Sequence, residues 1–375
     1  MVTVYLTSPV MYPWRLSLGF PRVEPISQRL ACLMEGSVAG IADVAKAAGV
    51  SKSTVSRALS GSGYVSAETR LRVAEVAASL GFVASTNAAS LVTGQTKNVG
   101  VVIPFVNRWY FGEVLEGIEG ALTGAGYDLS LYRLRDDEEQ RKRVFDYFLV
   151  RKRVDAVIAV GIALNTHEVQ LLHNLAKPIV GIGGEVDGIS TLSIDDEASA
   201  HLATTHLISL GHRRIIHLGG SLDRQMDFTT HAKRLEGYRR AMAEAGLGAA
   251  QGYVPTEFTM EGGYAAALQL LADPRERPTA IFAGCDEIAF GAIIAARQLG
   301  VGVPSGLSVI GIDGHENAAM FGLTTLRQQP ALQGERAVGL IMAELATPRI
   351  DFAAEHFSVP VDLDVRSSTT SPATA

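Results

Sequence analysis

From Asn98 onward, short runs rich in β-branched residues alternate with polar or glycine-containing turns and with helical patterns. The runs are VGVVIP, YDLSLYRL, VDAVIAVG, KPIVGIGG, RRIIHLGG, TAIFAGCD and LSVIGIDG. Alternation of this kind is typical of parallel sheets covered by helices on both faces. Seven or more strands over about 270 residues predict an α/β fold built from two doubly wound units.

The position of a ligand site follows from this architecture, because doubly wound folds bind ligands outside the carboxyl ends of their strands. The side chains that follow the strand runs are therefore the first candidates for a site. They are Tyr110, Phe111, Asp195, Asp196, Asp286 and Asp313.

A different pattern precedes the sheets, in the stretch IADVAKAAGVSKSTVSRALSGSGYVSAETR (residues 41–70). Apolar residues recur there at helical spacing, Gly49 ends a first helix, and Ser51 and Ser66 are placed to cap a second and a third. Gly81 ends the third helix. Three helices in about forty residues, the first two joined by a tight glycine turn, predict a helix-turn-helix unit.

The second of these helices gathers polar groups around a small apolar stripe: Ser51, Lys52, Ser53, Thr54, Ser56 and Arg57. In a recognition helix such side chains meet base edges and phosphates, and an arginine can bridge O6 and N7 of guanine. The alternative is an ordinary solvated face. The charge distribution favours DNA binding. Residues 41–97 carry six basic and three acidic side chains, a net charge of +3, whereas the whole chain has a net charge of −6 and the remainder therefore −9.

Residues 83–97, VASTNAASLVTGQTK, form a polar linker with weak helix propensity in which Leu91 stands out. One interpretation is a flexible tether. The other is a short helix that orders only on DNA, with Leu91 wedged between base steps in the minor groove.

Several classes of site and location are disfavoured. Cys32 and Cys285 lie far apart, so neither a disulfide nor a metal site is expected. No catalytic motif or cofactor fingerprint is complete, since Val186 stands where GIGGEVDG would need its third glycine. No apolar run is long enough to span a bilayer. Residues 1–37 are typical of a disordered extension, or of a mis-assigned start with Met34 as the first residue. They do not have the pattern of a signal peptide, so we expect a cytoplasmic protein.

The chain resembles the lactose-repressor (LacI/GalR) family of bacterial transcription regulators. The family's A-G-V-S-x-x-T-V-S-R run is intact at residues 48–57, and the blocks NRWYFGEVLEGIEGAL, HLISLGHRRIIHLGG, RLEGYRRAM, DEIAFGA, LGVGVPSGLSVIGID and LTTLRQQ match further along. The resemblance covers nearly all of the chain beyond residue 37. It implies a helix-turn-helix headpiece, a hinge helix, and a core like the periplasmic sugar-binding proteins with an effector cleft between two subdomains.

The resemblance also implies roles for particular residues. Base-reading positions fall on Lys52, Ser53 and Arg57, and Thr54, Ser56 and Thr69 fall near phosphate, with Leu91 in the hinge. The effector positions fall on Tyr110, Phe111, Arg234, Phe258, Asp286, Asp313 and Gln328. Aromatic faces and charged groups of this kind suit a sugar. The implied partners are operator DNA, a small carbohydrate effector, and further copies of the chain in a homodimer or tetramer.

Four positions depart from the family pattern. Gly40 replaces the usual threonine before the first helix, and Ala84 and Ser85 replace the Pro-Asn that opens the hinge helix. Ala89 stands where an arginine commonly precedes the hinge Ser-Leu, and Cys285 stands where asparagine is common. We therefore expect a weaker minor-groove contact and one missing polar contact to the effector.

These observations predict the following organisation: a helix-turn-helix domain at 38–82, a hinge at 83–97, an effector and dimerisation core at 98–368, and a tail at 369–375. Within the core we expect an N-subdomain at about 98–190 and 325–350 and a C-subdomain at about 191–324 and 351–368. The expected function is transcriptional regulation, with no enzyme activity. The alternatives are a solute-binding or carbohydrate-processing protein that uses the same core, and a purely architectural DNA binder.

Overall fold

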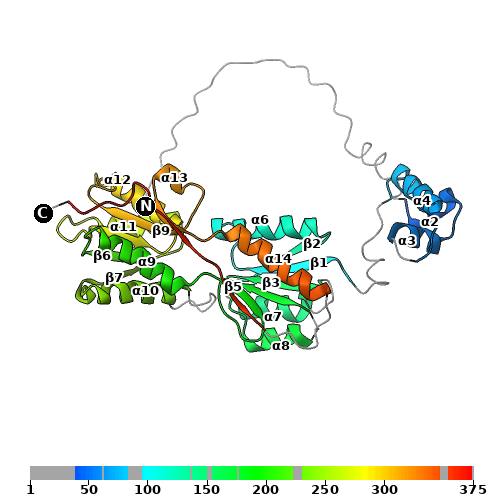
Figure 1. Ribbon diagram of the computed structural model, residues 1–375, viewed down its shortest axis with the longest axis horizontal. Coiled ribbons are helices and arrows are strands. Elements are labelled where there is room, and N and C mark those ends of the chain that lie inside the picture. The colour runs from blue at the N-terminus through cyan, green and yellow to red at the C-terminus, as the bar shows by residue number, and fades with distance from the viewer. Residues whose placement is uncertain are drawn as a thin grey trace, which may run out of the picture. The chain divides into compact units, whose positions relative to one another are not determined.

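The computed structural model describes residues 39–60, 63–82, 95–135, 137–149, 154–174, 177–222, 230–346 and 354–373. The chain divides into two compact units, residues 1–89 and residues 90–375 (Figure 1). Leu91 and the departures at Ala84, Ser85 and Ala89 lie outside the described residues, as does the 1–37 extension.

The described residues of the first unit form three helices, α2 (Ile41–Ala48), α3 (Lys52–Ser60) and α4 (Ala67–Ser79). Gly49 takes a left-handed conformation (φ 68°) at the end of α2, where the chain turns into α3. The three helices share a core of small and β-branched side chains that includes Val44, Val55 and Val73, all fully buried. The predicted helix-turn-helix unit is confirmed.

Where the structure describes the second unit, its strands form two six-stranded sheets, each in its own lobe. The N-lobe sheet has the order β11-β5-β4-β3-β1-β2, and all its pairs are parallel. Its strands are β1 (Asn98–Ile103), β2 (Asp128–Arg133), β3 (Ala156–Val160), β4 (Ile179–Ile182), β5 (Ser190–Ser193) and β11 (His356–Ser358). Its helical segments are α6 (Trp109–Gly124), α7 (Glu138–Lys142), a π-helical turn (Arg143–Leu149), α8 (Thr166–Asn174) and α14 (Pro330–Ala346).

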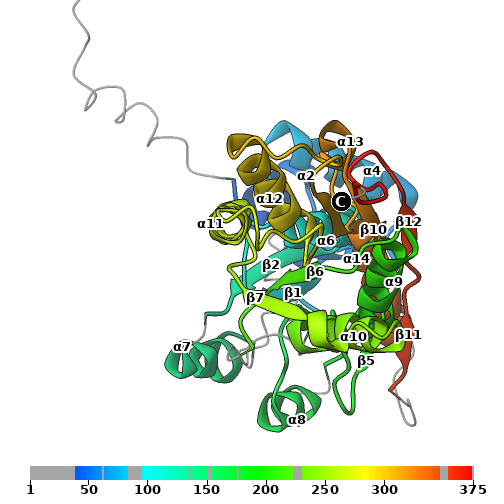
Figure 2. The same cartoon turned by 90° about the vertical axis from the view of Figure 1, so that its left-hand side faces the viewer.

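The C-lobe sheet has the order β12-β10-β9-β8-β6-β7, and only the pair β10–β12 is antiparallel. Its strands are β6 (Ile215–Gly219), β7 (Gly252–Pro255), β8 (Ala280–Ala283), β9 (Ser308–Asp313), β10 (Thr324–Arg327) and β12 (Asp362–Asp364). Its helices are α9 (Asp196–Ser209), α10 (Thr230–Glu244), α11 (Met260–Leu270), α12 (Asp286–Gln298) and α13 (Ala318–Phe321), with a 3₁₀ turn at Gly248–Ala250. Figure 2 shows α9 and α10 on one side of this sheet and α11 and α12 on the other.

Glycines allow the paired helices to pack closely. A Cβ added to Gly117 of α6 would lie 2.0 Å from the carbonyl oxygen of Ala331 in α14, and one on Gly237 of α10 would lie 2.1 Å from that of Glu197 in α9. Backbones that approach this closely leave no room for a methyl group. The helix pairs are therefore held together by backbone contact as well as by side chains.

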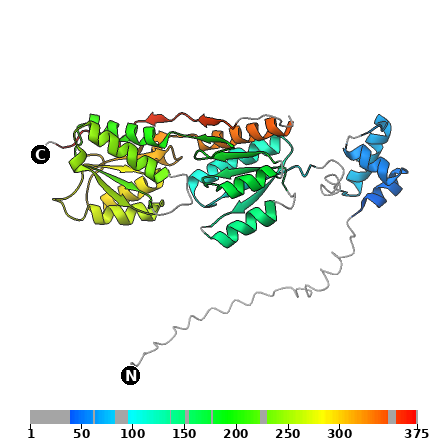
Figure 3. The ribbon, with the colours of Figure 1, turned by 90° about the horizontal axis from the view of Figure 1, so that it is seen from below.

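Three segments cross between the lobes, and they correct the predicted subdomain limits. The chain passes from β5 to α9, returns from β10 to α14, and passes again from β11 to β12; Figure 3 shows the last pair, in red, running along both lobes. Residues 191–193 of β5 and residues 356–358 belong to the N-lobe, and residues 325–327 belong to the C-lobe, opposite to expectation. The predicted tail also begins too early, because the amide of Thr370 donates to Ser308 Oγ at 3.1 Å.

Candidate functional site

The exposed face of α3 carries the polar side chains that the sequence singles out. Lys52, Ser53, Ser56 and Arg57 are exposed, whereas Val55 faces the core of the unit. The amide of Thr54 donates to Ser51 Oγ at 3.1 Å, so Ser51 caps the helix as expected. The geometry therefore presents a row of hydroxyls and two cations to solvent.

Arg57 is held along the helix. Its Nε donates to the carbonyl oxygen of Ser53 at 3.2 Å, and its Nη2 lies 3.5 Å from Ser53 Oγ. Both contacts link residues one helical turn apart, so the guanidinium already has a preferred direction before any ligand arrives. Thr69 lies in the first turn of α4, where Ser66 Oγ accepts from its amide at 3.3 Å.

The departure at Gly40 has a compensating contact. Gly40 has no side chain that could cap α2, but its amide donates to Asp43 Oδ2 at 2.8 Å. Asp43 lies in the first turn of α2, where a negative charge also interacts favourably with the helix dipole. The beginning of α2 is therefore stabilised without the usual threonine.

A cavity of about 570 Å³ lies between the two lobes, at the carboxyl ends of their strands. Its walls combine aromatic rings with charged and amide side chains from both lobes. Six of the seven predicted effector residues line it, namely Tyr110, Phe111, Arg234, Phe258, Asp313 and Gln328. A mixture of apolar faces and a few convergent polar groups is typical of small-molecule sites.

The aromatic walls depend on nearby glycines. Tyr110 and Phe111 occupy the first turn of α6, with ring centroids 5.3 Å apart in an edge-to-face arrangement. Gly161 has φ +59°, and a Cβ there would lie 2.6 Å from the ring of Phe111. Across the cavity, a Cβ on Gly284 would lie 3.0 Å from the ring of Phe258. A side chain at either glycine would therefore crowd the ring beside it.

Arg234 forms a buried ion pair with Asp196. Its Nε lies 2.8 Å from Asp196 Oδ1, its Nη1 donates to the carbonyl oxygen of Gly284, and both side chains of the ion pair are less than a tenth exposed. Burial raises the pKa of Asp196, and the guanidinium opposes that rise.

Asp313 ends β9 and faces the cavity. Its φ is 146°, a conformation that side chains rarely adopt, and its Oδ1 accepts from Gln328 Nε2 at 2.6 Å. Burial raises the pKa of Asp313 to about 8, and the negative charge of Asp286 acts in the same direction while Arg234 opposes it. Strain and burial of this kind concentrate at functional sites.

A chain of hydrogen bonds connects Asp313 to the N-lobe. Gln333 Nε2 donates to the carbonyl oxygen of Gln328 at 2.8 Å, and the hydroxyl of Tyr110 donates to Gln333 Oε1 at 3.2 Å. Gln333 is 1% exposed and lines the cavity. Gln333 was not predicted from the sequence, because a glutamine in the first turn of a helix carries no distinctive pattern.

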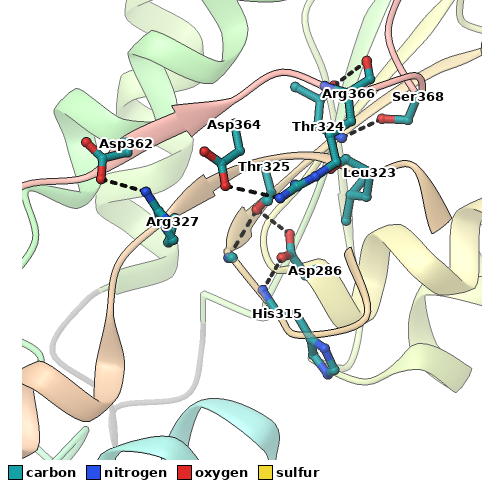
Figure 4. A network of polar contacts seen from close by, with 11 residues as sticks. Asp286, His315, Leu323, Thr324, Thr325, Arg327, Asp362, Asp364, Arg366 and Ser368 are labelled. Atoms are coloured by element: carbon teal, nitrogen blue, oxygen red, sulfur yellow. Dashed lines mark hydrogen bonds and ion pairs between the residues drawn. The ribbon is translucent and has the colours of Figure 1, made fainter. Parts of the chain in front are cut away.

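Asp286 differs from the prediction. The described residues that line the cavity include its neighbours Cys285 and Glu287 but not Asp286 itself. Its Oδ1 accepts from the hydroxyl of Thr325 at 2.7 Å, and its Oδ2 accepts from the amide of His315 at 2.8 Å (Figure 4). Position after a strand was a poor guide here, because the first residue of a helix can turn its side chain into the loop beside it.

Known protein families match both the helix-turn-helix unit and the two-lobed core of this chain. Residues 40–85 match the family "Bacterial regulatory proteins, lacI family", and residues 204–369 match "Periplasmic binding protein-like domain". The chain is 34% identical over 321 residues to the HTH-type transcriptional repressor PurR of Proteus mirabilis, covering 84% of this chain and 92% of that protein.

The chain belongs to the lacI family of bacterial regulatory proteins. Its fold matches the Lac repressor dimer bound to operator and the anti-inducer ONPF, with a TM-score of 0.78 at 24% identity over 89% of this chain and all of that one. It also matches a complex of the transcriptional regulator CelR with cellobiose, with a TM-score of 0.62 at 26% identity over 88% of this chain and 99% of that one.

This lacI-family chain is a DNA-binding transcriptional regulator with an effector-binding core. The relative PurR is a transcriptional repressor. No described helix is long and apolar enough to cross a membrane. Of the family departures within the described residues, Cys285 is buried in the cavity wall, where it offers a weakly polar thiol in place of an amide.

Proposed function

We propose that this repressor binds a two-fold symmetric operator as a dimer through α3, and that a sugar or sugar derivative in the interlobe cavity sets its operator affinity. On α3, Lys52, Ser53 and Arg57 read base edges, while Thr54 and Ser56, with Thr69 on α4, lie against phosphate. Support comes from the exposed row of hydroxyls and cations on α3 and from the match with the operator-bound Lac repressor fold.

The observation that carries the effector proposal is the composition of the cavity wall. Phe111 and Phe258 offer ring faces to the C–H surface of a sugar, and Asp313 and the Asp196–Arg234 pair offer acceptors and donors to its hydroxyls. Asp313 Oδ2 has no hydrogen-bond partner among the described residues, so one acceptor remains for a ligand. The cellobiose complex of CelR supports the same class of ligand.

The effector acts by population shift. The cavity has walls from both lobes, so a ligand that contacts both favours one arrangement of the lobes by its differential affinity. A solute-binding protein built on the same core would not require a helix-turn-helix unit, and a purely architectural DNA binder would not require the cavity. Regulation requires both.

The test is a melting-temperature screen of the full chain against neutral sugars, with purine bases and nucleosides as the competing class. A ligand at a hundred times its Kd stabilises the folded state by about 2.7 kcal/mol. We expect at least one sugar to raise the Tm of the wild type and to leave that of Asp313→Ala unchanged. Stabilisation by purines alone would replace the sugar proposal with a nucleobase effector.

A further inference from the structure

An aromatic contact joins the two lobes beside the cavity. Trp109 is the first residue of α6 in the N-lobe, directly before Tyr110 and Phe111, and His315 follows β9 in the C-lobe, two residues beyond Asp313. Their rings stack with centroids 4.6 Å apart and planes inclined by 22°. The indole N–H is buried and has no hydrogen-bond partner in the described part of the chain. Ring stacking, not a hydrogen bond, therefore accounts for the contact.

The His315 ring is fixed in place from its own lobe. The amide of Asn317 donates to His315 Nδ1 at 3.0 Å, which makes that nitrogen an acceptor and directs the ring. The ring of Phe290 in α12 meets it edge-on, with centroids 5.1 Å apart. The imidazole is thus held between α12 and Trp109.

Asp286 holds the turn that carries this ring. Its Oδ2 accepts from the amide of His315 at 2.8 Å, and its Oδ1 accepts from the hydroxyl of Thr325, whose oxygen in turn accepts from the amide of Gly314 at 3.2 Å (Figure 4). A Cβ on Gly311 would lie 2.1 Å from Asp286 Oδ1, so β9 must pass the carboxylate with a glycine. A fully buried carboxylate with this many donors specifies one conformation of the turn.

We propose that Asp286 is a positioning residue that joins effector binding to lobe contact, because it holds the turn from Asp313 to His315 and so places one side chain in the cavity and the other against Trp109. Asp286 itself touches neither the cavity nor Trp109. Displacement of Asp313 by a ligand would move the same turn, and with it the stacked ring. The coupling to an effector rests on the proposed function, whereas the hold on His315 does not.

The experiment uses Trp109 as a reporter in the full chain. Trp14 is the only other tryptophan, so Trp14→Phe leaves one emitting indole. Acrylamide quenching is then measured for this background and for added Asp286→Asn, His315→Ala and Glu316→Gln. Glu316 is an exposed neighbour in the same turn and serves as the matched control.

We expect Asp286→Asn and His315→Ala each to raise the quenching constant about twofold or more, since both remove the stacked partner from Trp109, and Glu316→Gln to leave it unchanged. Thr325→Val, which lacks the bridging hydroxyl, decides the case if Asp286→Asn does not fold, and should raise the constant in the same direction. The positioning role would be overturned if His315→Ala raised the quenching constant but Asp286→Asn left it unchanged. If Asp286→Asn does not fold, an unchanged constant in Thr325→Val would overturn it in the same way. No change in His315→Ala would overturn the stack itself. No ligand enters this measurement, so failure of the sugar screen leaves its result intact.

Discussion

Replacing Arg234 with alanine should destabilise the core strongly, and more so at neutral than at acidic pH. The guanidinium and Asp196 are 7% and 6% exposed as side chains, so the substitution leaves a buried carboxylate without its cation. Breaking a buried pair by removing one partner costs roughly 3–5 kcal/mol. Because Asp196 borders a cavity, we expect the lower end, about 3 kcal/mol of unfolding free energy at pH 7.5.

The pH dependence follows from the raised pKa of Asp196. Loss of Arg234 removes the main effect that opposes burial, so the folded-state pKa of this carboxyl rises further above its unfolded value. A group whose pKa is raised on folding contributes stability at low pH and loses it as the pH rises through the folded-state pKa. The deficit of Arg234→Ala should therefore grow from pH 5 to pH 7.5, by up to about 1.4 kcal/mol per pH unit while Asp196 titrates.

Urea unfolding of the full chain, with the transition of the core fitted separately, measures these deficits. Arg240→Ala is the matched control, because Arg240 pairs with Glu197 on the same two helices but both side chains are about 40% exposed. That pair should contribute about 0–1 kcal/mol. Adding Asp196→Ala to Arg234→Ala should recover most of the loss. A deficit in Arg234→Ala that equals the control, or that does not change with pH, would refute the reasoning.

Three further changes test other parts of the molecule. Arg57→Ala should weaken binding to the selected operator by roughly 1–3 kcal/mol and to random DNA much less, whereas Arg72→Ala on α4 should not discriminate; equal losses on both DNAs would assign Arg57 to positioning. Gly117→Ala should lower the unfolding free energy by roughly 1–3 kcal/mol, because its Cβ would meet the backbone of Ala331, while Gly120→Ala, with open space around it, should be neutral or stabilising; similar effects of the two would argue against the close α6–α14 contact. Burial lowers the pKa of His217 to about 3, so the wild type should lose stability as the pH falls below about 6.5, and His217→Gln should lose less over that range; parallel pH profiles would show that His217 does not contribute.

Much of the architecture was predictable because it depends on local patterns. The three helices of the first unit follow from apolar spacing and from caps at Ser51 and Ser66, and all seven predicted strand runs form strands. The lobe limits were not predictable in the same way. Strands β5, β10 and β11 are four, four and three residues long, and nothing in so short a run says which of two sheets it will join.

The cavity residues likewise divide into those that local sequence patterns predict and those that depend on tertiary packing. Tyr110, Phe111 and Asp313 were found because they follow strands, and the topology brings such residues to one edge of each sheet. The partner of Arg234 was missed, since pairing across α9 and α10 depends on how two helices cross at Gly237. Asp286 was assigned to the wrong side of its helix for a similar reason, because its direction is set by the turn at His315 rather than by its own sequence neighbours.

The regulation of operator affinity by a molecule in the cavity is tested most directly by one binding measurement. A duplex selected by the full chain from random DNA is labelled, and its Kd is measured by fluorescence anisotropy with and without the sugar that raises the Tm, for the wild type and for Asp313→Ala. We predict that the sugar changes the Kd of the wild type about tenfold, equivalent to a coupling free energy of roughly 1.4 kcal/mol, and leaves that of the variant unchanged. An unchanged Kd for the wild type at saturating sugar, or the same change in both proteins, would contradict the account.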